Sequence, residues 1–392
     1  MELVELGSIL HIEKGKKPLV QSKEPVDGYL PYVDIKAFEK GIIDNYATTD
    51  RSLLCEDGDL LIVCDGSRSG LTGRAIKGVV GSTLSKIYAD GLTTDYLRYF
   101  IQSKYIALNT QKKGTGTPHL NVNILKGSKL VVPSIPEQQR VVSRIEELFS
   151  SLDKVVDTLQ KTKEQLTLYR QAVLKEAFEG KLTNSTIIKN GIIGDYIEKP
   201  RYGTSKKCDY QSGERFKDVY RIPNIDAKLG VLNHTDIKRA EFYGKELEGL
   251  DLKIGDILII RSNGSPSLVG TAAMVRESDI NGTFAGYLMR LRIKEVDTLL
   301  PKFLLLFLSS FDARTYIERV SKSTSGVNNI NAQEVSKIPI PVFGVTDQST
   351  IVKEIESRIS LCDQIEKIVN EAFVEAEAMR QSILKEAFEG GL

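Results

Sequence analysis

The residues best suited to chemistry in this sequence are cations and amides in glycine-rich loops. Lys112 and Lys113 precede the run Gly114-Thr115-Gly116-Thr117, and backbone amides beside two cations are typical of a phosphate-binding loop. Arginine and asparagine side chains in similar loops can also hydrogen-bond to the edges of nucleic-acid bases. These loops are therefore candidate contact sites for a ligand.

Both halves of the chain supply such loops, and the corresponding loops differ in residue type. Asp65-Gly66-Ser67-Arg68 in the first half corresponds to Ser262-Asn263-Gly264-Ser265 in the second. The opposing interpretation is that these are ordinary solvated loops whose glycines only form turns. The candidate contact residues are Lys16, Lys17, Ser67, Arg68, Arg74, Lys112, Lys113, Thr115, Thr117 and His119 in the first half, and Arg201, Lys206, Lys207, Arg261, Asn263, Ser265, Lys322, Ser323, Thr324 and Asn328 in the second.

No catalytic or metal-binding pattern accompanies these loops. His119 and His234 are isolated histidines without a carboxylate or nucleophile placed beside them, so we predict no catalytic residue. The run from Asp65 to Gly70 resembles a phosphate loop, but no Gly-Lys-Ser/Thr follows it. An adenine methyltransferase would need an Asn/Asp-Pro-Pro-Tyr/Phe motif, and the sequence contains no Pro-Pro. The four cysteines form no Cys-x-x-Cys pair, which favours free thiols over a metal site.

The elements that position these loops are organised by an internal repeat. Residues 174–182 read LKEAFEGKL, and residues 384–392 read LKEAFEGGL, 210 positions later, with one difference. Upstream of each copy, apolar residues recur in steps of three and four. Such steps describe a narrow apolar stripe along a helix, of the kind that two paired helices bury between them. The predicted seam of the helix pair is Ile145, Leu152, Leu159, Leu166 and Val173 with Ile355, Cys362, Val369, Ala376 and Ile383.

Helix start and stop residues bound both segments. Ser134 followed by Pro136 and Glu137 is a typical helix start, and Gly180 is a typical stop. Thr346 is the predicted cap of the second helix. We therefore predict spacer segments over 134–182 and 344–392, each containing a long helix of about 40 residues and roughly 60 Å. An antiparallel pair of this length forms a coiled-coil-like spacer with pseudo-two-fold symmetry, which would hold two similar globules at a fixed separation.

The segments 1–133 and 183–343 are the two predicted globules. Gly58-Asp59-Leu60-Leu61 corresponds to Gly255-Asp256-Ile257-Leu258, and Gly7 corresponds to Gly194. Short apolar runs such as 59–63 and 129–132 predict buried strands, and the spacing of apolar residues predicts a helix over 94–108. The fold class is therefore α+β, with two repeated α/β globules separated by long helices. Four apolar residues on the outer helix faces are expected either to bind a partner or to pack on the globules, namely Leu168, Phe178, Val374 and Phe388.

Composition excludes some alternatives. The 53 Lys and Arg residues nearly balance the 52 Asp and Glu residues, so any attraction for a polyanion must come from local basic surfaces. The N-terminal segment carries acids early and has no long apolar run, and no stretch is long enough to cross a membrane. We therefore expect a soluble, cytoplasmic protein.

The repeated segments resemble those of a known family. IPEQQRVVSRIEELFSSLD from Ile135, YRQAVLKEAFEGKL ending at Leu182, MRQSILKEAFEGGL at the C-terminus and TGTPHLNVNILKGSKLVVPSIPEQQ closing the first globule are similar to the specificity subunits of type I restriction-modification systems. The second half departs slightly, because PVFGVTDQS replaces the usual proline-rich run into Glu-Gln. The resemblance covers the whole chain. It identifies 1–133 and 183–343 as target recognition domains and the helices as spacers.

The resemblance implies a function that the residues alone do not show. Each recognition domain would read one half of a split double-stranded DNA target, and the spacer helices would set the gap between the halves. The helices would also bind two methyltransferase subunits, which carry S-adenosylmethionine, and restriction subunits that use ATP and Mg²⁺ would join that core. This chain would hold no cofactor and catalyse no reaction itself. The alternative is a scaffold that joins protein partners through two related globules and never contacts DNA.

Overall fold

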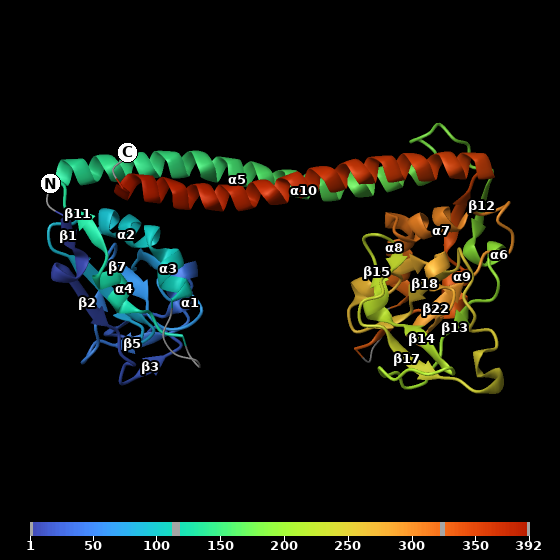
Figure 1. Ribbon diagram of the computed structural model, residues 1–392, viewed down its shortest axis with the longest axis horizontal. Coiled ribbons are helices and arrows are strands. Elements are labelled where there is room, and N and C mark those ends of the chain that lie inside the picture. The colour runs from blue at the N-terminus through green and yellow to red at the C-terminus, as the bar shows by residue number, and fades with distance from the viewer. Residues whose placement is uncertain (1–2, 112–117, 322–325, 390–392) are drawn as a thin grey trace. The chain divides into compact units, whose positions relative to one another are not determined.

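A computed structural model describes residues 3–111, 118–321 and 326–389, and Figure 1 traces its helices and strands. The contacts within the chain divide it into two compact units. Unit 1 is Met1–Gln160 with Asn370–Leu392, and unit 2 is Lys161–Val369. Each unit contains one globular region and a part of both long helices, α5 (Ile135–Phe178) and α10 (Val345–Glu389). The fold is α+β with a repeated globular region, as predicted.

Unit 1 is built on a four-stranded antiparallel sheet with the strand order β2-β10-β7-β8. Strand β7 is the apolar run predicted as a buried strand, and every residue in it is buried. A second sheet has the order β3-β5-β4-β9-β6, in which β4 and β9 are parallel, and β1 pairs with β11. The strands are β1 (Leu3–Glu5), β2 (Leu10–Lys14), β3 (Gln21–Ser22), β4 (Tyr29–Val33), β5 (Tyr46–Thr48), β6 (Leu54–Cys55), β7 (Leu60–Val63), β8 (Thr72–Arg74), β9 (Gly78–Val80), β10 (Leu84–Ala89) and β11 (Lys129–Val131).

The helix predicted over 94–108 is two helices. α2 (Thr94–Ser103) ends at Lys104, whose backbone leaves the helical region with φ −99° and ψ 1°, and α3 (Tyr105–Thr110) follows. The prediction of one continuous helix was therefore wrong. The apolar spacing continues across the break because Leu108 of α3 is buried against Gly70, where an added Cβ would lie 2.8 Å from the Leu108 Cβ. The remaining helices of unit 1 are η1 (Leu6–Ser8), α1 (Ile35–Lys40) and α4 (Val122–Lys126).

Residues of both long helices complete the core of unit 1. Ile145 of α5 and Leu384 of α10 are buried in the same cluster as Leu60 of the sheet. Phe388 of α10 packs edge-on against Tyr96 and Phe100 of α2, with ring centroids 5.1 and 5.4 Å apart. The C-terminal part of α10 therefore packs on the N-terminal globule.

Unit 2 repeats this architecture on a longer sheet with the order β13-β22-β18-β20-β16-β15. Its second sheet has the order β17-β14-β21, with β14 and β21 parallel as β4 and β9 are in unit 1. The strands are β12 (Lys189–Ile192), β13 (Arg201–Tyr202), β14 (Phe216–Tyr220), β15 (Ile225–Asp226), β16 (Val231–Leu232), β17 (Lys238–Glu241), β18 (Ile257–Ile260), β19 (Ser262–Asn263), β20 (Ala272–Met274), β21 (Thr283–Phe284), β22 (Leu288–Leu291), β23 (Asn328–Asn329) and β24 (Pro339–Val342).

Glycines mark corresponding points of the two units. Gly58 and Gly255 precede β7 and β18 with φ +89° and +88°, a backbone region that glycine adopts most readily. A Cβ at Gly7 would lie 2.9 Å from the Lys126 Cβ, and a Cβ at Gly194 would lie 2.9 Å from the Ser336 Cβ. The matches predicted from the sequence are therefore also matches in backbone geometry. The helices of unit 2 are α6 (Ile193–Tyr196), η2 (Ile222–Asn224), η3 (Gly244–Leu247), η4 (Pro266–Leu268), η5 (Glu277–Asp279), α7 (Pro301–Leu308), α8 (Phe311–Val320) and α9 (Ala332–Ser336).

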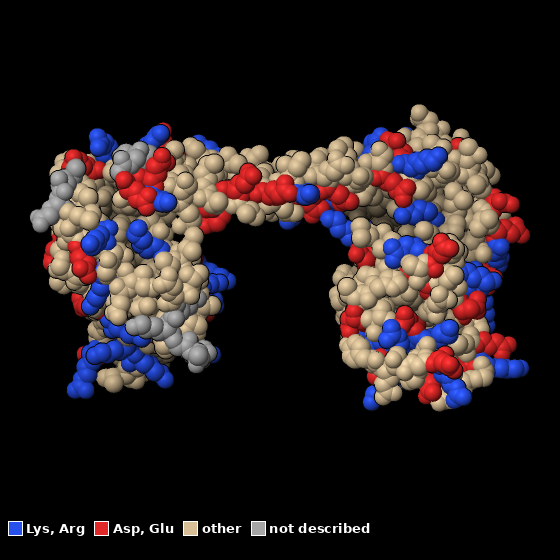
Figure 2. All heavy atoms as spheres, viewed as in Figure 1, with Lys and Arg blue, Asp and Glu red and all other residues tan. Residues whose placement is uncertain are grey.

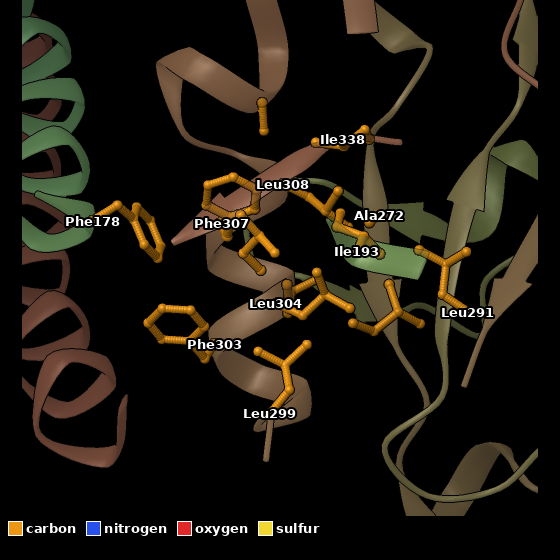
Figure 3. Packing of buried hydrophobic residues seen from close by; sticks show 14 of the residues in the cluster. Phe178, Ile193, Ala272, Leu291, Leu299, Phe303, Leu304, Phe307, Leu308 and Ile338 are labelled. Atoms are coloured by element: carbon orange, nitrogen blue, oxygen red, sulfur yellow. The ribbon is translucent and has the colours of Figure 1, made fainter. Parts of the chain in front are cut away.

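Figure 3 shows how α5 joins the core of unit 2. Phe178 projects from α5 towards Phe303 and Phe307 of α7, with both ring centroids 5.2 Å from its own. Leu304 and Leu308 of α7 are buried with them. Phe178 occupies the position in the repeat that Phe388 occupies in unit 1. Of the four outer-face residues, Phe178 and Phe388 therefore pack on globules, whereas Leu168 and Val374 are 72% and 71% exposed.

The first turns of the long helices differ in capping. The amide of Ser134 donates to Glu137 Oε2 at 2.9 Å and its hydroxyl donates to the same oxygen at 2.8 Å, which confirms Ser134 as the cap of α5. The prediction that Thr346 caps α10 was wrong. Val345 is already helical, and the amide of Gln348 bonds to the carbonyl of Gly344. Gly344 precedes the helix but has no side chain that could cap it, so the prediction took the next hydroxyl residue, Thr346, as the cap.

The predicted seam follows the buried side of both helices. In unit 1, Ile145, Leu152 and Ala376 are buried, and in unit 2, Leu166, Val173, Ile355, Cys362 and Val369 are buried. Leu159 and Ile383 are half-buried. In each unit the helices also form an ion pair across the seam. Arg380 pairs with Asp153 in unit 1, and Arg170 Nη2 lies 2.7 Å from Asp363 Oδ1 in unit 2. Arg170 and Arg380 correspond in the repeat, as do Asp153 and Asp363, so the helices pair antiparallel in the same register in both units.

Candidate nucleic-acid interface

A groove of about 780 Å³ opens on unit 2 where β13, β22 and the end of β18 meet the second sheet. Among the described residues that line it are four cations, namely Lys206, Arg221, Lys238 and Arg261, and no carboxylate. Tyr202 and Tyr287 also line it and expose 39% and 65% of their surface. Cations interleaved with exposed aromatic rings match the two needs of a nucleic-acid surface, charge neutralisation and stacking.

Gly203 lines the groove at a point where two backbone segments lie very close together. Its amide bonds to the carbonyl of Leu288, and a Cβ would lie 2.3 Å from the carbonyl oxygen of Phe284. Only glycine fits so close to another backbone. Gly15 follows β2 in unit 1 as Gly203 follows β13. Its amide bonds to the carbonyl of Leu84, and a Cβ there would lie 2.2 Å from the Gly81 oxygen. Both units therefore have the same close backbone contact at this point.

Arg261 is fixed in the groove from two sides. Its guanidinium carbon lies 4.4 Å from the ring centroid of Tyr202, and its Nη1 donates to the carbonyl of Gly286 at 3.1 Å. Its Nε is buried and has no hydrogen-bond partner among the described residues. Stacking and one hydrogen bond thus hold the guanidinium in place, and a positioned guanidinium can bind paired acceptors such as those on the edge of guanine.

The other three cations line the groove from separate elements. Arg221 follows β14 and pairs with Asp236 at 3.0 Å. Lys206 donates to the carbonyl of Glu241 at 2.8 Å and pairs with Glu246. Lys238 begins β17 and lies 5.0 Å from the ring centroid of Tyr210. Arg221, Lys238 and both tyrosines were not among the predicted residues. They come from different strands, and only strand pairing brings them together.

In unit 1, the corresponding position after β7 holds an acid with two partners. Asp65 Oδ1 lies 2.7 Å from His119 Nδ1, and Asp65 Oδ2 lies 2.9 Å from Lys14 Nζ. Burial acts to raise the pKa of Asp65, but hydrogen bonds from His119 and Lys14 outweigh it and hold the pKa below its usual value. The counterpart in unit 2 is the bridge between β19 and β23, where asparagine and serine replace these charged groups. The two units thus present different chemistry at one shared position.

The structure brings together two groups of the predicted residues. Arg261, Asn263, Ser265 and Asn328 meet at the paired β19 and β23, where Asn328 Nδ2 donates to the Gly264 carbonyl at 3.1 Å and Asn263 Oδ1 accepts from the Ser265 amide at 2.8 Å. In unit 1, Ser67 and Arg68 lie in the loop after β7 that is bridged to His119.

Other predicted residues are engaged elsewhere. Arg68 pairs with Glu39, and Arg74 pairs with Asp95 at the start of α2. Arg74 also lies opposite Leu60 in the sheet, at the other end of β7 from the Asp65 loop. Lys16, Lys17 and Lys207 are exposed and form no salt bridge within the described residues. Lys112, Lys113, Thr115, Thr117, Lys322, Ser323 and Thr324 lie outside the described residues.

Charge is distributed differently on the two units. On the face shown in Figure 2, Lys and Arg side chains of unit 1 gather at the end of the globule away from the helices, around β3 and β5. On unit 2, cations and acids are mixed over the visible face.

The expectation that no carboxylate lies beside His119 or His234 was wrong, because Asp65 pairs with His119 and Asp279 pairs with His234. His234 Nε2 lies 2.7 Å from Oδ1 of Asp279, a fully buried acid. Asp279 Oδ2 also accepts from the amide of Arg276 at 2.7 Å and from its Nε at 3.3 Å. Within the residues that the structure describes, no group of three or more His, Cys, Asp or Glu side chains is arranged to hold a metal ion. None of the described helices has the length and apolar character that crossing a membrane requires.

Comparison with known proteins finds relatives of one kind. Residues 1–168 match the model of the type I restriction modification DNA specificity domain. The chain is 30% identical over 220 residues to the type I restriction enzyme MjaVIII specificity subunit of Methanocaldococcus jannaschii, covering 55% of this chain and 51% of that protein. It is 26% identical over 321 residues to the StySPI specificity subunit of Salmonella potsdam, covering 77% and 66%. The chain thus spans about half and about two thirds of these relatives.

The fold has a solved counterpart. A chain from a structural study of complex assembly and conformational transition in the type I R-M system aligns over 100% of this chain and 98% of its own length, with a TM-score of 0.76 and 18% identity. The similarity in fold extends over both halves, including the second half that the family model does not match. The chain is thus similar in sequence to type I restriction-modification specificity subunits, and in fold to a solved chain over both of its halves.

Proposed function

We propose that this chain is the DNA sequence-recognition subunit of a type I restriction-modification complex, and that each globular region reads one half of a split target. The observation that carries the proposal is the groove of unit 2, where four cations and two exposed tyrosines line one surface. Gly15 forms the same close backbone contact in unit 1, followed by the exposed Lys16 and Lys17. Two related surfaces with different side chains suit a target with two different halves.

The long helices have a separate role in this proposal. They set the gap between the half-sites, and their exposed apolar residues, including Leu168 and Val374, contact two methyltransferase subunits. Methyl transfer from S-adenosylmethionine and ATP- and Mg²⁺-dependent cleavage are assigned to the methyltransferase and restriction subunits. This chain contributes recognition and no catalytic group.

The test is target selection by the assembled complex. The chain is purified with its methyltransferase subunits and incubated with S-adenosylmethionine and a random DNA library, and methylated adenines are mapped. We expect one split motif that disappears when this chain is omitted. Exchange of residues 183–343 for those of a relative should change one half of the motif and leave the other unchanged. A complex that forms and methylates DNA without any dependence on this chain would favour the protein scaffold instead.

A second experiment tests the helices. Insertion of about four residues, close to one helical turn, beside Thr162 of α5 should change the permitted gap in the methylated motif while both half-sites remain the same. An unchanged gap would contradict the assignment of spacing to the helices.

A further inference from the structure

A second cavity of unit 2, separate from the groove, has the composition of an anion site. It measures about 500 Å³ and lies on the other side of β13, because Arg201 faces it while the adjacent Tyr202 lines the groove. Alternation of side chains along a strand produces this division. Four cations and two glutamates line the cavity, in the set Glu198, Lys199, Arg201, Lys245, Glu248, Gly249 and Arg290.

Arg290 is the unusual member of the set. Only 6% of its surface is exposed, and its Nε has no hydrogen-bond partner among the described residues. Its Nη1 donates to the carbonyl of Asp251, while the nearest oxygen of the Asp251 carboxylate is 3.7 Å away. A buried charged donor without a partner costs free energy unless a ligand or water satisfies it.

A second cation lies directly opposite Arg290. Arg201 of β13 is its register partner on β22, and like charges at such positions destabilise a sheet. The Arg201 guanidinium lies on the backbone of Gly249, where a Cβ would meet Nη2 at 2.9 Å, and Nη2 donates to the Glu248 carbonyl at 3.4 Å. Burial and the charge of Arg292 both lower the pKa of Arg290. The Asp251 carboxylate at 3.7 Å is the one acid paired with Arg290 among the described residues, and no salt bridge to Arg201 is formed among them.

We propose that this cavity binds a phosphate group of the DNA backbone, held between Arg290 and Arg201. Planar guanidinium groups bind phosphate through paired hydrogen bonds, and Lys199 and Lys245 add positive charge at the exposed side of the cavity. The inference rests on the proposed function for the source of the phosphate. Because β13 is the edge strand of its sheet, DNA that lies in the groove can reach the cavity around this edge. The contact is with a phosphate and does not depend on base sequence.

The experiment uses the full chain and two probes, a random-sequence DNA duplex and inorganic phosphate. Binding of the duplex is measured from roughly 50 to 200 mM salt, and the melting temperature is measured with and without phosphate. The variants are Arg290→Met, Arg201→Ala and, as a matched control, Lys189→Ala. Lys189 is an exposed cation of unit 2 outside the cavity. Because Arg201 is exposed, its variant keeps the test valid if Arg290→Met does not fold.

Loss of one phosphate contact should reduce the slope of log Kobs against log salt by about 1 in the cavity variants, with no change for Lys189→Ala. Phosphate should raise the melting temperature of the wild type more than that of either cavity variant. If the wild type binds DNA and the cavity variants keep its slope, the inference is overturned and the proposed function stands. If phosphate stabilises only the wild type but the duplex does not bind, the cavity binds free phosphate and the DNA contact is refuted together with the proposed function.

Discussion

The side chain of Gln138 in α5 accepts a hydrogen bond from the amide of Thr93 at 2.8 Å. Gln138 is fully buried. Its Nε2 donates to the carbonyls of Gly91 and Pro133 at 2.7 and 3.0 Å. One side chain therefore satisfies three backbone groups between the first turn of α5 and the start of α2. Replacement by alanine removes all three of these partly buried hydrogen bonds.

We expect Gln138→Ala to destabilise unit 1 by about 3 kcal/mol, because each of the three lost hydrogen bonds contributes roughly 1 kcal/mol. The free energy of unfolding by urea measures the loss. Gln139→Ala is the control, since Gln139 is adjacent and exposed, and it should change stability little. Gln348 makes the same three types of bond, to Leu300, Thr298 and Phe343, so Gln348→Ala should cause a similar loss in unit 2. Equal stability of Gln138→Ala and Gln139→Ala would contradict this role.

Arg261 provides a test of base reading. Lysine keeps the charge but lacks the planar group that stacks on Tyr202 and bonds to Gly286. We expect Arg261→Lys to reduce discrimination at one base of the half-site read by unit 2 by about 1–3 kcal/mol, with non-specific DNA binding retained. Mapping of methylated motifs with the assembled complex measures the change. Lys207→Ala is the contrast, and it should weaken binding to all sequences equally. If Arg261→Lys left discrimination unchanged, Arg261 would not be a residue that contacts a base.

The interhelical ion pairs should differ in strength. Arg170 contacts both Asp363 and Glu366, at 2.7 and 2.9 Å, whereas Arg380 pairs with Asp153, whose side chain is 62% exposed. Solvent screens both pairs, so we expect a coupling energy of about 1 kcal/mol for Arg170 with Asp363 and less for Arg380 with Asp153. Double-mutant cycles with alanine, by urea unfolding at low and high salt, measure both. A larger coupling energy for Arg380 with Asp153 would show that solvent exposure does not determine which of the two ion pairs is stronger.

Asp279 gives stability a defined pH dependence. Burial acts to raise its pKa, but hydrogen bonds from the Arg276 amide, His234 and Ser278 outweigh it and hold the pKa below the usual value. A carboxyl group whose pKa is lowered on folding stabilises the protein at pH values above its unfolded-state pKa. That stabilisation is lost as the pH falls through the folded-state pKa. We expect Asp279→Asn to lose about 2 kcal/mol at pH 7, with the difference from the wild type shrinking as the pH falls below about 4.

The measurement for Asp279 is the urea midpoint from neutral to acidic pH. The control is Glu277→Gln, an exposed neighbour whose loss should leave the midpoint nearly unchanged. A stability difference between Asp279→Asn and the wild type that stays constant over the whole range would show that the charge of Asp279 is not its source.

Local and repeated features of this fold could be predicted from the sequence. The paired helices follow from apolar spacing, and Ser134 and Glu137 identify one helix start because the capping bonds are local. The break at Lys104 could not be predicted, since apolar residues keep the helical spacing across it. It depends on α3 packing against Gly70, which lies far away in sequence.

The candidate site was predicted only in part for the same reason. Loop composition identifies Arg261, Asn263 and Asn328, which lie at or next to paired strands. It cannot show that Arg68 and Arg74 have acidic partners in Glu39 and Asp95, because those pairs join distant segments. Arg221 and Lys238 reach the groove through the order of strands in unit 2, which no local pattern encodes.

The core of unit 1 includes residues near the C-terminal end of α10, which are far from the first globule in sequence. Leu384 and Ala387 are buried with residues of the first 150 positions. On the ribosome, the first globule therefore emerges long before the residues that complete its core, whereas unit 2 consists of one continuous segment. The globule made first should be the last to acquire full protection from proteases, and truncation of α10 should expose the N-terminal half of the protein to degradation.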